Sequence, residues 1–467
     1  MTRRVRSAIV IGVAGVLLCV CAWLLHRGAN GIRVGTAVVS KTLCSGTFVS
    51  GVDPDVLYAE AVKPIPGQTL LAKHLRYSVD REKREVTASW RGVLESRAVY
   101  YDGFGCMLVH GRAPESVQVG TVSAKTAGTA TDPVTVLPLR IEPSSPKLEE
   151  ALDRAFAEPG QPPYRHVKAI VILHDGKLVA ERYTPGYSAR TPILGYSLAK
   201  SVTNALIGIL VRQNKLSVEQ RAPVAEWSDP SDPRHSITID QLMRMTSGLA
   251  LEESDSGVDP VSRMLFLEPD MAGFAEHARL KATPGTTWEY TSGNTLILSR
   301  ILRDAVGGHA QDVVEFARKE LFDPLGTTTA TIEFDKTGTP VGSIYVFASA
   351  RDWARFGELY RDDGVVNGRR ILPEGWVNYS AAPTLESDYG AGFWTNRGAH
   401  GEDAKARIRL GMAEDAFYGS GNLGQRVVVV PSQGLVVVRL GLTHSPGFDM
   451  KGLLRLLSET SAGLRNP

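Results

Sequence analysis

Two apolar stretches, far apart in the chain, constrain the fold more than any other feature. Residues 166–183 read HVKAIVILHDGKLVAERY, and residues 425–441 read QRVVVVPSQGLVVVRLG. Each predicts a β-hairpin, because strand-forming residues flank a turn, which in the first stretch is Asp-Gly. A long, mostly helical middle lies between them, and a helical segment follows from about 450 to 465. This order predicts an α+β fold in which one antiparallel sheet is built from both ends around a helical insertion.

The chain divides into four parts. Residues 139–467 form the domain with the two hairpins, and residues 123–138, rich in small residues and proline, predict a linker. Residues 31–122 combine β-branched and aromatic residues with glycine-rich breaks, which predicts a small, mostly β module. Residues 1–30 form an N-terminal membrane anchor or signal segment.

The N-terminal segment carries arginines ahead of an uncharged apolar stretch, residues 8–25. Eighteen residues of helix span about 27 Å, which is close to the thickness of a bilayer core. We therefore expect an uncleaved membrane anchor, with the alternative of a signal that is cleaved to release a secreted protein. Arginines before the span keep the N-terminus in the cytoplasm, so the bulk of the chain would lie in the periplasm or outside the cell.

Composition and cysteine usage agree with an exported globular protein. The chain has 52 Lys and Arg against 50 Asp and Glu, a net charge of +2, so nucleic-acid binding has no electrostatic support. Two of the four cysteines lie in the apolar stretch, which leaves Cys44 and Cys106 in the exported part. An oxidising compartment favours a disulfide between them, and two buried free thiols are the alternative.

A serine and a lysine three residues apart begin a long apolar run in GYSLAKSVTNALIGILV, residues 195–211. If a helix starts at Ser197, Lys200 lies on the same side and can approach the serine hydroxyl. The helix N-terminus adds free amide donors, which stabilise an alkoxide and favour a neutral lysine that accepts a proton. The alternative is a helix-capping serine followed by an ordinary lysine. A second copy of the spacing, Ser144 and Lys147, contains a proline and is assigned a structural role.

A second motif, EYTSGNT at residues 289–295, places Tyr290 in a turn ahead of a helix. Ser-x-x-Lys followed at this distance by Tyr-x-Ser resembles the penicillin-recognising serine hydrolases. That family includes class C β-lactamases, D-alanyl-D-alanine carboxypeptidases, β-lactamase-fold esterases and 6-aminohexanoate-dimer hydrolases. The resemblance extends over residues 140–465, is strongest to the 6-aminohexanoate-dimer hydrolases, and includes MTSGL at 245–249, ASARDWARFGELY at 348–360 and the second hairpin. It implies a β-lactamase/transpeptidase-like fold.

The resemblance also implies roles for individual residues. Ser197 matches the acylated nucleophile, Lys200 its base partner and Tyr290 a second acid/base; which of the last two is the proximate base stays open. The backbone amides of Ser197 and Asn422 would form the oxyanion hole. Ser292 matches a substrate-binding polar position.

The third family motif departs from its usual form. Where many relatives carry Lys or His, this chain reads Gly419-Ser420-Gly421, and these three residues are the remaining candidates for substrate binding. Without the cation, substrates that present a carboxylate, such as β-lactams and peptidoglycan, are less suited than neutral esters or amides. The same glycines match a dinucleotide fingerprint by chance, because they run into a strand instead of opening a helix.

The sequence therefore predicts a serine hydrolase that cleaves a small-molecule ester or amide, in the manner of a 6-aminohexanoate-dimer hydrolase or esterase, without cofactor or metal. Two alternatives stay open. One is a class C-like β-lactamase or D-alanyl-D-alanine carboxypeptidase, and the other is a non-catalytic penicillin-binding-like receptor. Neither the natural substrate nor the oligomeric state follows from the sequence.

Overall fold

A seven-stranded sheet is the framework of the C-terminal domain in the computed structural model, which describes residues 27–110, 140–142, 144–254, 256–398, 401–444 and 446–465. Its strands follow the order β13-β14-β15-β16-β6-β7-β5. Their bounds are β5 Arg140–Ile141, β6 Val167–His174, β7 Lys177–Tyr183, β13 Trp394–Thr395, β14 Phe417–Gly421, β15 Gln425–Val430 and β16 Leu435–Gly441.

The two predicted hairpins, β6-β7 and β15-β16, meet in the middle of this sheet. Strand β16 runs antiparallel to β6, with Val437 opposite Ile172. The prediction of a sheet built from both ends of the domain is therefore confirmed. One edge differs from the prediction, because β5 pairs parallel to β7.

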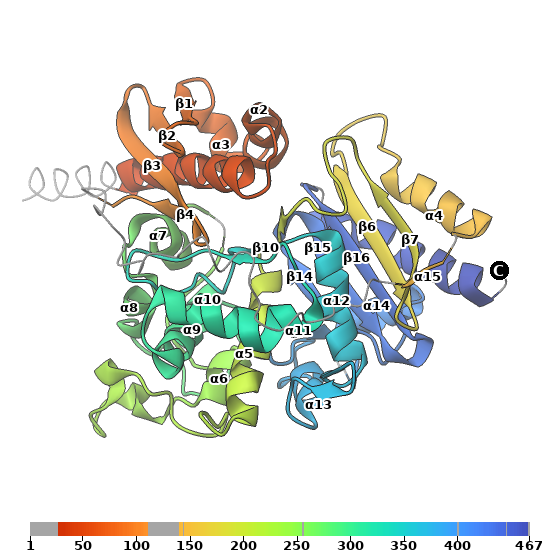
Figure 1. Cartoon of the computed structure of the whole chain (residues 1–467). Helices are drawn as coiled ribbons and strands as arrows, with labels where there is room; N and C mark the ends of the chain where they lie inside the picture. Colours follow the sequence, from red (N-terminus) through yellow and green to blue (C-terminus); the bar gives the residue numbers. More distant parts are fainter. Residues whose placement is uncertain are drawn as a thin grey trace, which may run out of the picture.

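Helices cover both faces of the sheet. Figure 1 shows α4 and α15 on one face, and α12 on the other, where it contacts β6, β15 and β16. Because side chains alternate along a strand, Val436 and Val438 enter the core shared with α12, whereas Val437 enters the core shared with α4 and α15. Burial on both faces explains why these strands read as nearly continuous apolar runs.

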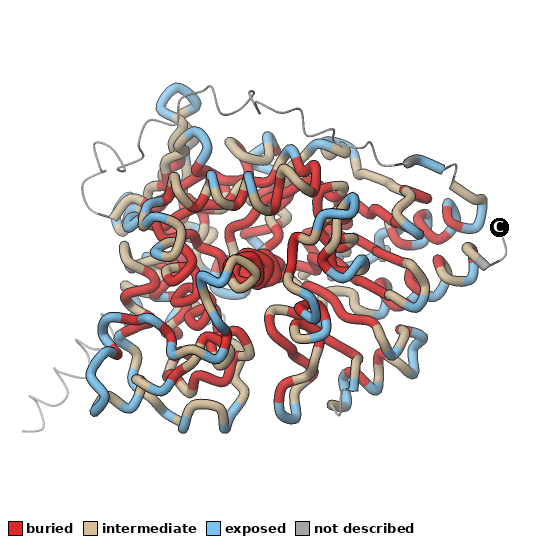
Figure 2. Tube along the Cα trace, turned by 60° about the horizontal axis from the view of Figure 1, so that its bottom comes forward, coloured by how far each residue is buried: buried red, intermediate tan, exposed pale blue. Residues whose placement is uncertain are grey.

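The helical insertion surrounds α5, whose residues from Leu198 to Leu210 are all buried. Buried residues fill the middle of the molecule, and exposed ones lie mostly on its outer loops (Figure 2). Helix α9 packs against α5, and both helices begin at the candidate site. The helices of this domain are α4 Pro146–Phe156, α5 Leu198–Arg212, α6 Ile239–Met243, α7 Pro260–Leu267, α8 Met271–Glu276, α9 Ser292–Val306, α10 Ala310–Ala317, η5 Arg318–Phe322, α11 Asp323–Leu325, α12 Ala350–Arg361, α13 Trp376–Ala381, α14 Glu402–Arg409 and α15 Met450–Arg465. Five short strands complete it: β8 Ile193–Leu194, β9 Thr331–Ile332, β10 Val346–Ala348, β11 Val365–Val366 and β12 Arg369–Arg370.

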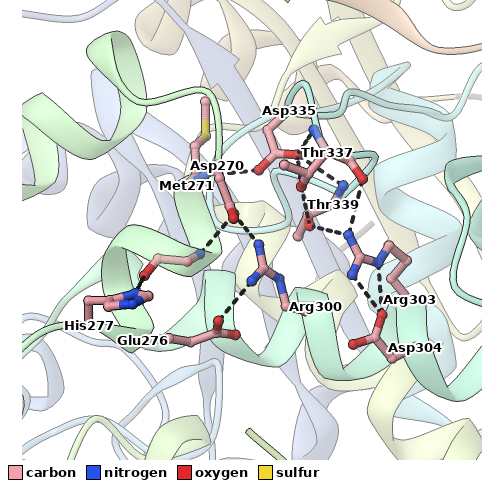
Figure 3. A network of polar contacts seen from close by, with 11 residues as sticks. Asp270, Met271, Glu276, His277, Arg300, Arg303, Asp304, Asp335, Thr337 and Thr339 are labelled. Atoms are coloured by element: carbon pink, nitrogen blue, oxygen red, sulfur yellow. Dashed lines mark hydrogen bonds and ion pairs between the residues drawn. The ribbon is translucent and has the colours of Figure 1, made fainter. Parts of the chain in front are cut away.

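A polar network holds α9 to its neighbours (Figure 3). Arg300 pairs with Asp270 and with Glu276, the latter through Nη1 and Oε2 at 2.8 Å. Arg303 donates to the Thr339 hydroxyl at 2.9 Å. Burial raises the pKa of Glu276 to about 7 even though Arg300 opposes this shift. These contacts fix the helix whose first residues carry part of the candidate site.

The N-terminal module is built from helices as well as strands. A helix covers residues 27–48 of the described chain, and a four-stranded antiparallel sheet follows in the order β1-β2-β3-β4. The other elements are α2 Pro54–Leu57, η1 Tyr58–Val62, α3 Pro66–Leu71, β1 Leu75–Asp80, β2 Glu85–Trp90, β3 Val93–Tyr101 and β4 Gly105–Leu108.

The prediction of a mostly β module was wrong for residues 31–48, and the helix crosses the predicted boundary at residue 30. Between residues 34 and 47 only Val38 and Thr42 are not fully buried. A helix that is buried on nearly every side has no polar face, so its sequence lacks the 3.6-residue period by which helices are recognised. Its glycines and β-branched residues added a strand-like composition.

The module docks on the C-terminal domain through buried polar and apolar contacts. Glu333, which is fully buried, accepts hydrogen bonds from Lys41, from the Ser45 hydroxyl at 2.9 Å and from the Cys106 amide at 2.7 Å. A disulfide joins Cys106 to Cys44, with the two Cα atoms 6.0 Å apart. Burial lowers the pKa of Lys41, and the charge of Glu333 opposes this shift. The module and the domain therefore share one interior.

Two predicted segments lie outside the described residues: the apolar span at residues 8–25 and the linker at residues 123–138. Within the residues that are described, no helix combines the length and the apolar character needed to cross a membrane.

Candidate active site

A strained turn presents Ser197. Strand β8 pairs with β10, and the amide of Gly195 continues that pairing by donating to the Val346 carbonyl at 2.9 Å. Tyr196 then adopts φ +47°, a left-handed conformation that is costly for a residue with a side chain. A β-carbon at Gly421 would lie 2.1 Å from the Gly195 carbonyl oxygen, so β14 approaches this turn closely. Strain of this kind is characteristic of functional sites.

Ser197 and Lys200 lie in hydrogen-bonding contact at the start of α5. Lys200 is only 3% exposed, and its Nζ is 3.1 Å from the Ser197 Oγ. The Ser197 side chain makes no capping hydrogen bond to the helix, so the structure does not support the alternative of a helix-capping serine. The second Ser-x-x-Lys copy behaves differently, because the neighbouring Ser145 caps α4 and Lys147 is exposed.

Lys200 has two further acceptors. Its Nζ lies 3.1 Å from the Ser292 Oγ and 3.1 Å from the backbone carbonyl of Ser343. Ser292 in turn donates from its amide and from its hydroxyl to the two carboxylate oxygens of Glu253, the hydroxyl at 3.1 Å. Ser292, predicted to bind substrate, is fully buried and instead connects Lys200 to Glu253. Its position fixes the amine beside Ser197.

Tyr290 stands over Lys200, with its ring centroid 4.7 Å from the lysine Nζ. Its ring centroid lies 6.0 Å from that of Trp394, in a stacked arrangement, and 5.7 Å from that of Tyr389, in a T-shaped arrangement. The MTSGL segment holds this loop, since the amide of Glu289 donates to the Met245 carbonyl at 2.9 Å. The MTSGL segment therefore holds the loop that carries Tyr290.

The third motif lies on β14, close to the first turn of α5. A β-carbon at Gly419 would be 2.9 Å from Leu198 and 3.1 Å from the Ser201 hydroxyl. Gly419 thus faces the first turn of α5, and a longer side chain at this position would require Leu198 to shift; its predicted role in substrate binding stays a prediction. Ser420 is half-buried, and the cation nearest in register is Arg426, directly opposite it on β15.

Arg426 is buried and donates to the Gly421 carbonyl at 3.0 Å. Burial lowers the pKa of Arg426, while the charges of Tyr418 and Tyr290 raise it by smaller amounts. Alternation along β15 places its side chain on the face away from α5, the same face as Val428. The positive charge of Arg426 therefore lies on the face of the sheet opposite to α5.

Asn422, the proposed second oxyanion residue, follows Gly421 at the end of β14 and is exposed. Its side-chain carbonyl accepts from the Leu423 amide at 2.8 Å, which fixes a tight turn in which Leu423 has φ +57°. The structure thus brings Ser197, Lys200, Tyr290 and Ser292 together and places the Gly421–Asn422 turn beside them.

Sequence reasoning missed Glu253 and the Ser343 carbonyl. Glu253 lies in the loop LEESDSG, where several acidic and serine residues look alike, so no spacing distinguishes it. A backbone carbonyl carries no sequence signal. Among the described residues, no group of three His, Cys, Asp or Glu side chains is arranged to hold a metal ion.

Comparison with known proteins shows the family and the fold. The family model described as Beta-lactamase matches residues 152–460. A 6-aminohexanoate-dimer hydrolase of Paenarthrobacter ureafaciens is 25% identical over 352 residues, which are 72% of this chain and 85% of that protein. A solved structure from Bacillus anthracis, described as a candidate 6-aminohexanoate-dimer hydrolase, has a TM-score of 0.56 at 23% identity and covers 72% of this chain and 89% of its own. A family VIII carboxylesterase has a TM-score of 0.53 at 14% identity, covering 68% and 98%.

Proposed function

We propose, since the chain belongs to the β-lactamase family of serine hydrolases, that Ser197 attacks an ester or amide carbonyl and carries the acyl group as an intermediate. The observation that carries the proposal is the 3.1 Å contact between the Lys200 Nζ and the Ser197 Oγ at a helix start where the serine caps nothing. This geometry fits a nucleophile beside its base.

The steps follow from the positions of the groups. In its neutral form, Lys200 accepts the proton of the Ser197 hydroxyl while the Ser197 Oγ bonds to the substrate carbonyl carbon. The backbone amides of Ser197 and Asn422 are proposed to receive the oxyanion. Tyr290 then protonates the leaving alcohol or amine as the scissile bond breaks. Water, losing a proton to the same groups, releases the acid and restores Ser197.

The neutral ester or amide preference rests on the third motif. Gly419 supplies no cation, and Arg426 is bonded to backbone carbonyls behind β14. The relative from Paenarthrobacter is named a 6-aminohexanoate-dimer hydrolase, and this name supports a small-molecule amide as substrate but not its neutrality, because an aminohexanoate carries a carboxylate. Two alternatives remain to be separated by experiment: a class C-like β-lactamase or carboxypeptidase, and a receptor that binds or acylates without turnover.

The decisive experiment is Ser197→Ala in the full chain, with p-nitrophenyl butyrate as substrate. The expected result is a fall in kcat/KM of at least about a thousandfold. The free energy of unfolding should stay within about 0.5 kcal/mol, because no cap is lost. Ser144→Ala is the matched control, since it changes the serine of the other Ser-x-x-Lys copy. Retained turnover in Ser197→Ala would show that the nucleophile is elsewhere.

The alternatives give different results with the wild type. Rapid turnover of a chromogenic cephalosporin would identify the β-lactamase. Stoichiometric acylation of Ser197 by penicillin, seen as a mass increase without ester turnover, would identify the receptor. Hydrolysis of neutral esters with neither result supports the proposal.

The chain is further proposed to be held at the cytoplasmic membrane by residues 8–25, with the hydrolase in the periplasm or outside the cell. The apolar stretch behind three arginines and the Cys44–Cys106 disulfide support this location, because disulfides persist in oxidising compartments. Secretion after cleavage is the alternative. Retention of the chain in membranes after an alkaline carbonate wash, and its release when residues 1–26 are deleted, would separate the two.

A further inference from the structure

A cavity of about 660 Å³ lies between the N-terminal module and the C-terminal domain. One wall is a single face of the helix over residues 27–48, from Gly28 through Gly31, Gly35 and Val38 to Thr42. The opposite wall includes Val261, Leu265 and Phe266 of α7. Figure 1 shows this helix lying over α7. A volume of this size is typical of small-molecule sites.

One end of the cavity adjoins the candidate active site. Three lining residues are immediate neighbours of site groups or belong to them: Tyr196 precedes Ser197, Ile344 follows the Ser343 carbonyl, and Asn422 is the proposed oxyanion residue. Glu253, which holds Ser292, also lines it. Four separate segments thus line the cavity and also flank the site, whereas Ser197 itself does not line the cavity. Thr42 is the residue of the helix face at this end, because Thr42 also lines a smaller cavity together with Leu194 and Tyr196.

The lining selects for an uncharged, apolar occupant. Among the described residues, the lining contains no lysine or arginine. Its carboxylate, Glu253, is engaged by Ser292, and its histidine, His444, contacts the Glu60 carbonyl at 2.9 Å. Burial lowers the pKa of His444, which favours the uncharged imidazole. A carboxylate or phosphate would find no counter-charge here.

Of the glycines on this face, Gly28 adjoins open space, whereas a β-carbon at Gly31 would lie 3.3 Å from Val258 and one at Gly35 would lie 2.4 Å from Leu71. Gly28, Gly31 and Gly35 recur on one face, although glycine is unfavourable inside a helix. From Thr42 at the catalytic end to Gly28, fourteen residues of helix rise about 21 Å. A channel along this face has room for an acyl chain of roughly a dozen carbons.

We propose that this cavity binds the acyl chain of the substrate, so that the enzyme prefers esters or amides of medium to long linear acids. The proposal rests on the hydrolase function of Ser197. The acyl side is favoured over the leaving-group side because Asn422, proposed to hold the carbonyl oxygen of the acyl group, lines the cavity, whereas Tyr290, proposed to protonate the leaving group, does not. The helix over residues 27–48, which the N-terminal module contributes to the cavity, therefore determines the length of the acyl chain that the enzyme accepts.

The test is a series of p-nitrophenyl esters from acetate to decanoate, with the full chain. Each methylene that enters an apolar cavity should raise kcat/KM about fourfold until the cavity is filled. An alkyl acetate series, in which the alcohol lengthens instead, should stay nearly flat. A flat acyl series in an enzyme that hydrolyses acetate, or a rise in the alkyl series alone, would overturn the proposal.

Two variants locate the effect. A β-carbon at Gly28 meets no atom within 4 Å, and Gly28 lies about 21 Å from Thr42, beyond the reach of a ten-carbon chain, so Gly28→Trp should leave decanoate hydrolysis within about twofold. Val38→Phe, about 6 Å from Thr42 on the same face, should cut decanoate hydrolysis at least tenfold while acetate hydrolysis changes less than twofold. Gly160→Trp is the matched control, because Gly160 is equally unhindered and lies outside the cavity. Equal decanoate rates in all three would contradict the assignment.

Binding separates failure of this inference from failure of the proposed function. Ser197→Ala should bind decanoyl amide in calorimetry, and Val38→Phe in the same background should weaken that binding at least tenfold. If no ester is hydrolysed but this binding is found, the catalytic proposal fails and the cavity assignment stands. If esters are hydrolysed and no variant alters the binding, the cavity assignment fails alone.

Discussion

Glu333→Gln should uncouple the N-terminal module from the C-terminal domain. In the wild type the Glu333 carboxylate is the counter-charge of Lys41, which is 2% exposed, and it also accepts from Ser45 and from the Cys106 amide. Glutamine keeps the shape but removes the charge, and it places a donor against donors. Breaking a buried ion pair by removing one partner costs about 3–5 kcal/mol. We expect a loss of that size in the free energy of unfolding.

A double-mutant cycle tests this reasoning. Urea unfolding of the wild type, Glu333→Gln, Lys41→Met and the double variant is followed by tryptophan fluorescence. The double variant should recover at least about 2 kcal/mol relative to the sum of the single losses, because an apolar replacement leaves no buried charge. Losses that add to within about 0.5 kcal/mol would mean that Lys41 and Glu333 are not coupled.

The pH dependence of Glu333→Gln gives an independent check. Burial already lowers the pKa of Lys41, and the substitution removes the charge of Glu333 that opposes this. The folded variant then binds fewer protons than its unfolded state, so its stability rises with pH. The deficit against the wild type should therefore shrink from pH 7 to pH 9. A deficit that is constant or grows over this range would refute the account.

Two further results are expected. Glu253→Gln should lower kcat/KM for butyrate esters about ten- to a hundredfold. The glutamine side chain has one oxygen in place of two, so it cannot accept as the carboxylate does from both the backbone N–H and the hydroxyl of Ser292, and hydrogen bonds to a charged group contribute about 1.5–3 kcal/mol. Unchanged kinetics in a folded variant would remove Glu253 from the site. Burial raises the pKa of Glu276 from 4.5 to about 7, so its contribution to stability is fully present below about pH 4.5 and is lost as the pH rises through about 7. This decline in the free energy of unfolding is on the order of 3 kcal/mol, and Glu276→Gln should flatten it in urea unfolding measured from pH 5 to pH 8. A decline equal to that of the wild type would assign the titration to another group.

The local chemistry of the site was accessible from the sequence because it depends on short spacings. Three residues of helix bring Lys200 beside Ser197, and this holds in any fold that starts a helix there. The two hairpins were equally readable, since their turns and β-branched residues act locally. The helix over residues 27–48 was misread for the opposite reason: its burial on nearly every side erased the period that depends on a solvent-facing surface.

What the sequence determined by itself is therefore the proximity of Lys200 to Ser197 and the sheet assembled from both ends of the domain. Only the tertiary structure decided what surrounds them. It placed Glu253 beside Ser292, packed Gly419 against Leu198 and Ser201, and lined an apolar cavity with a helix about 150 residues or more from Ser197 in the chain. These contacts join segments that share no spacing rule. Their geometry is set by the packing of buried surfaces, which a linear pattern does not contain.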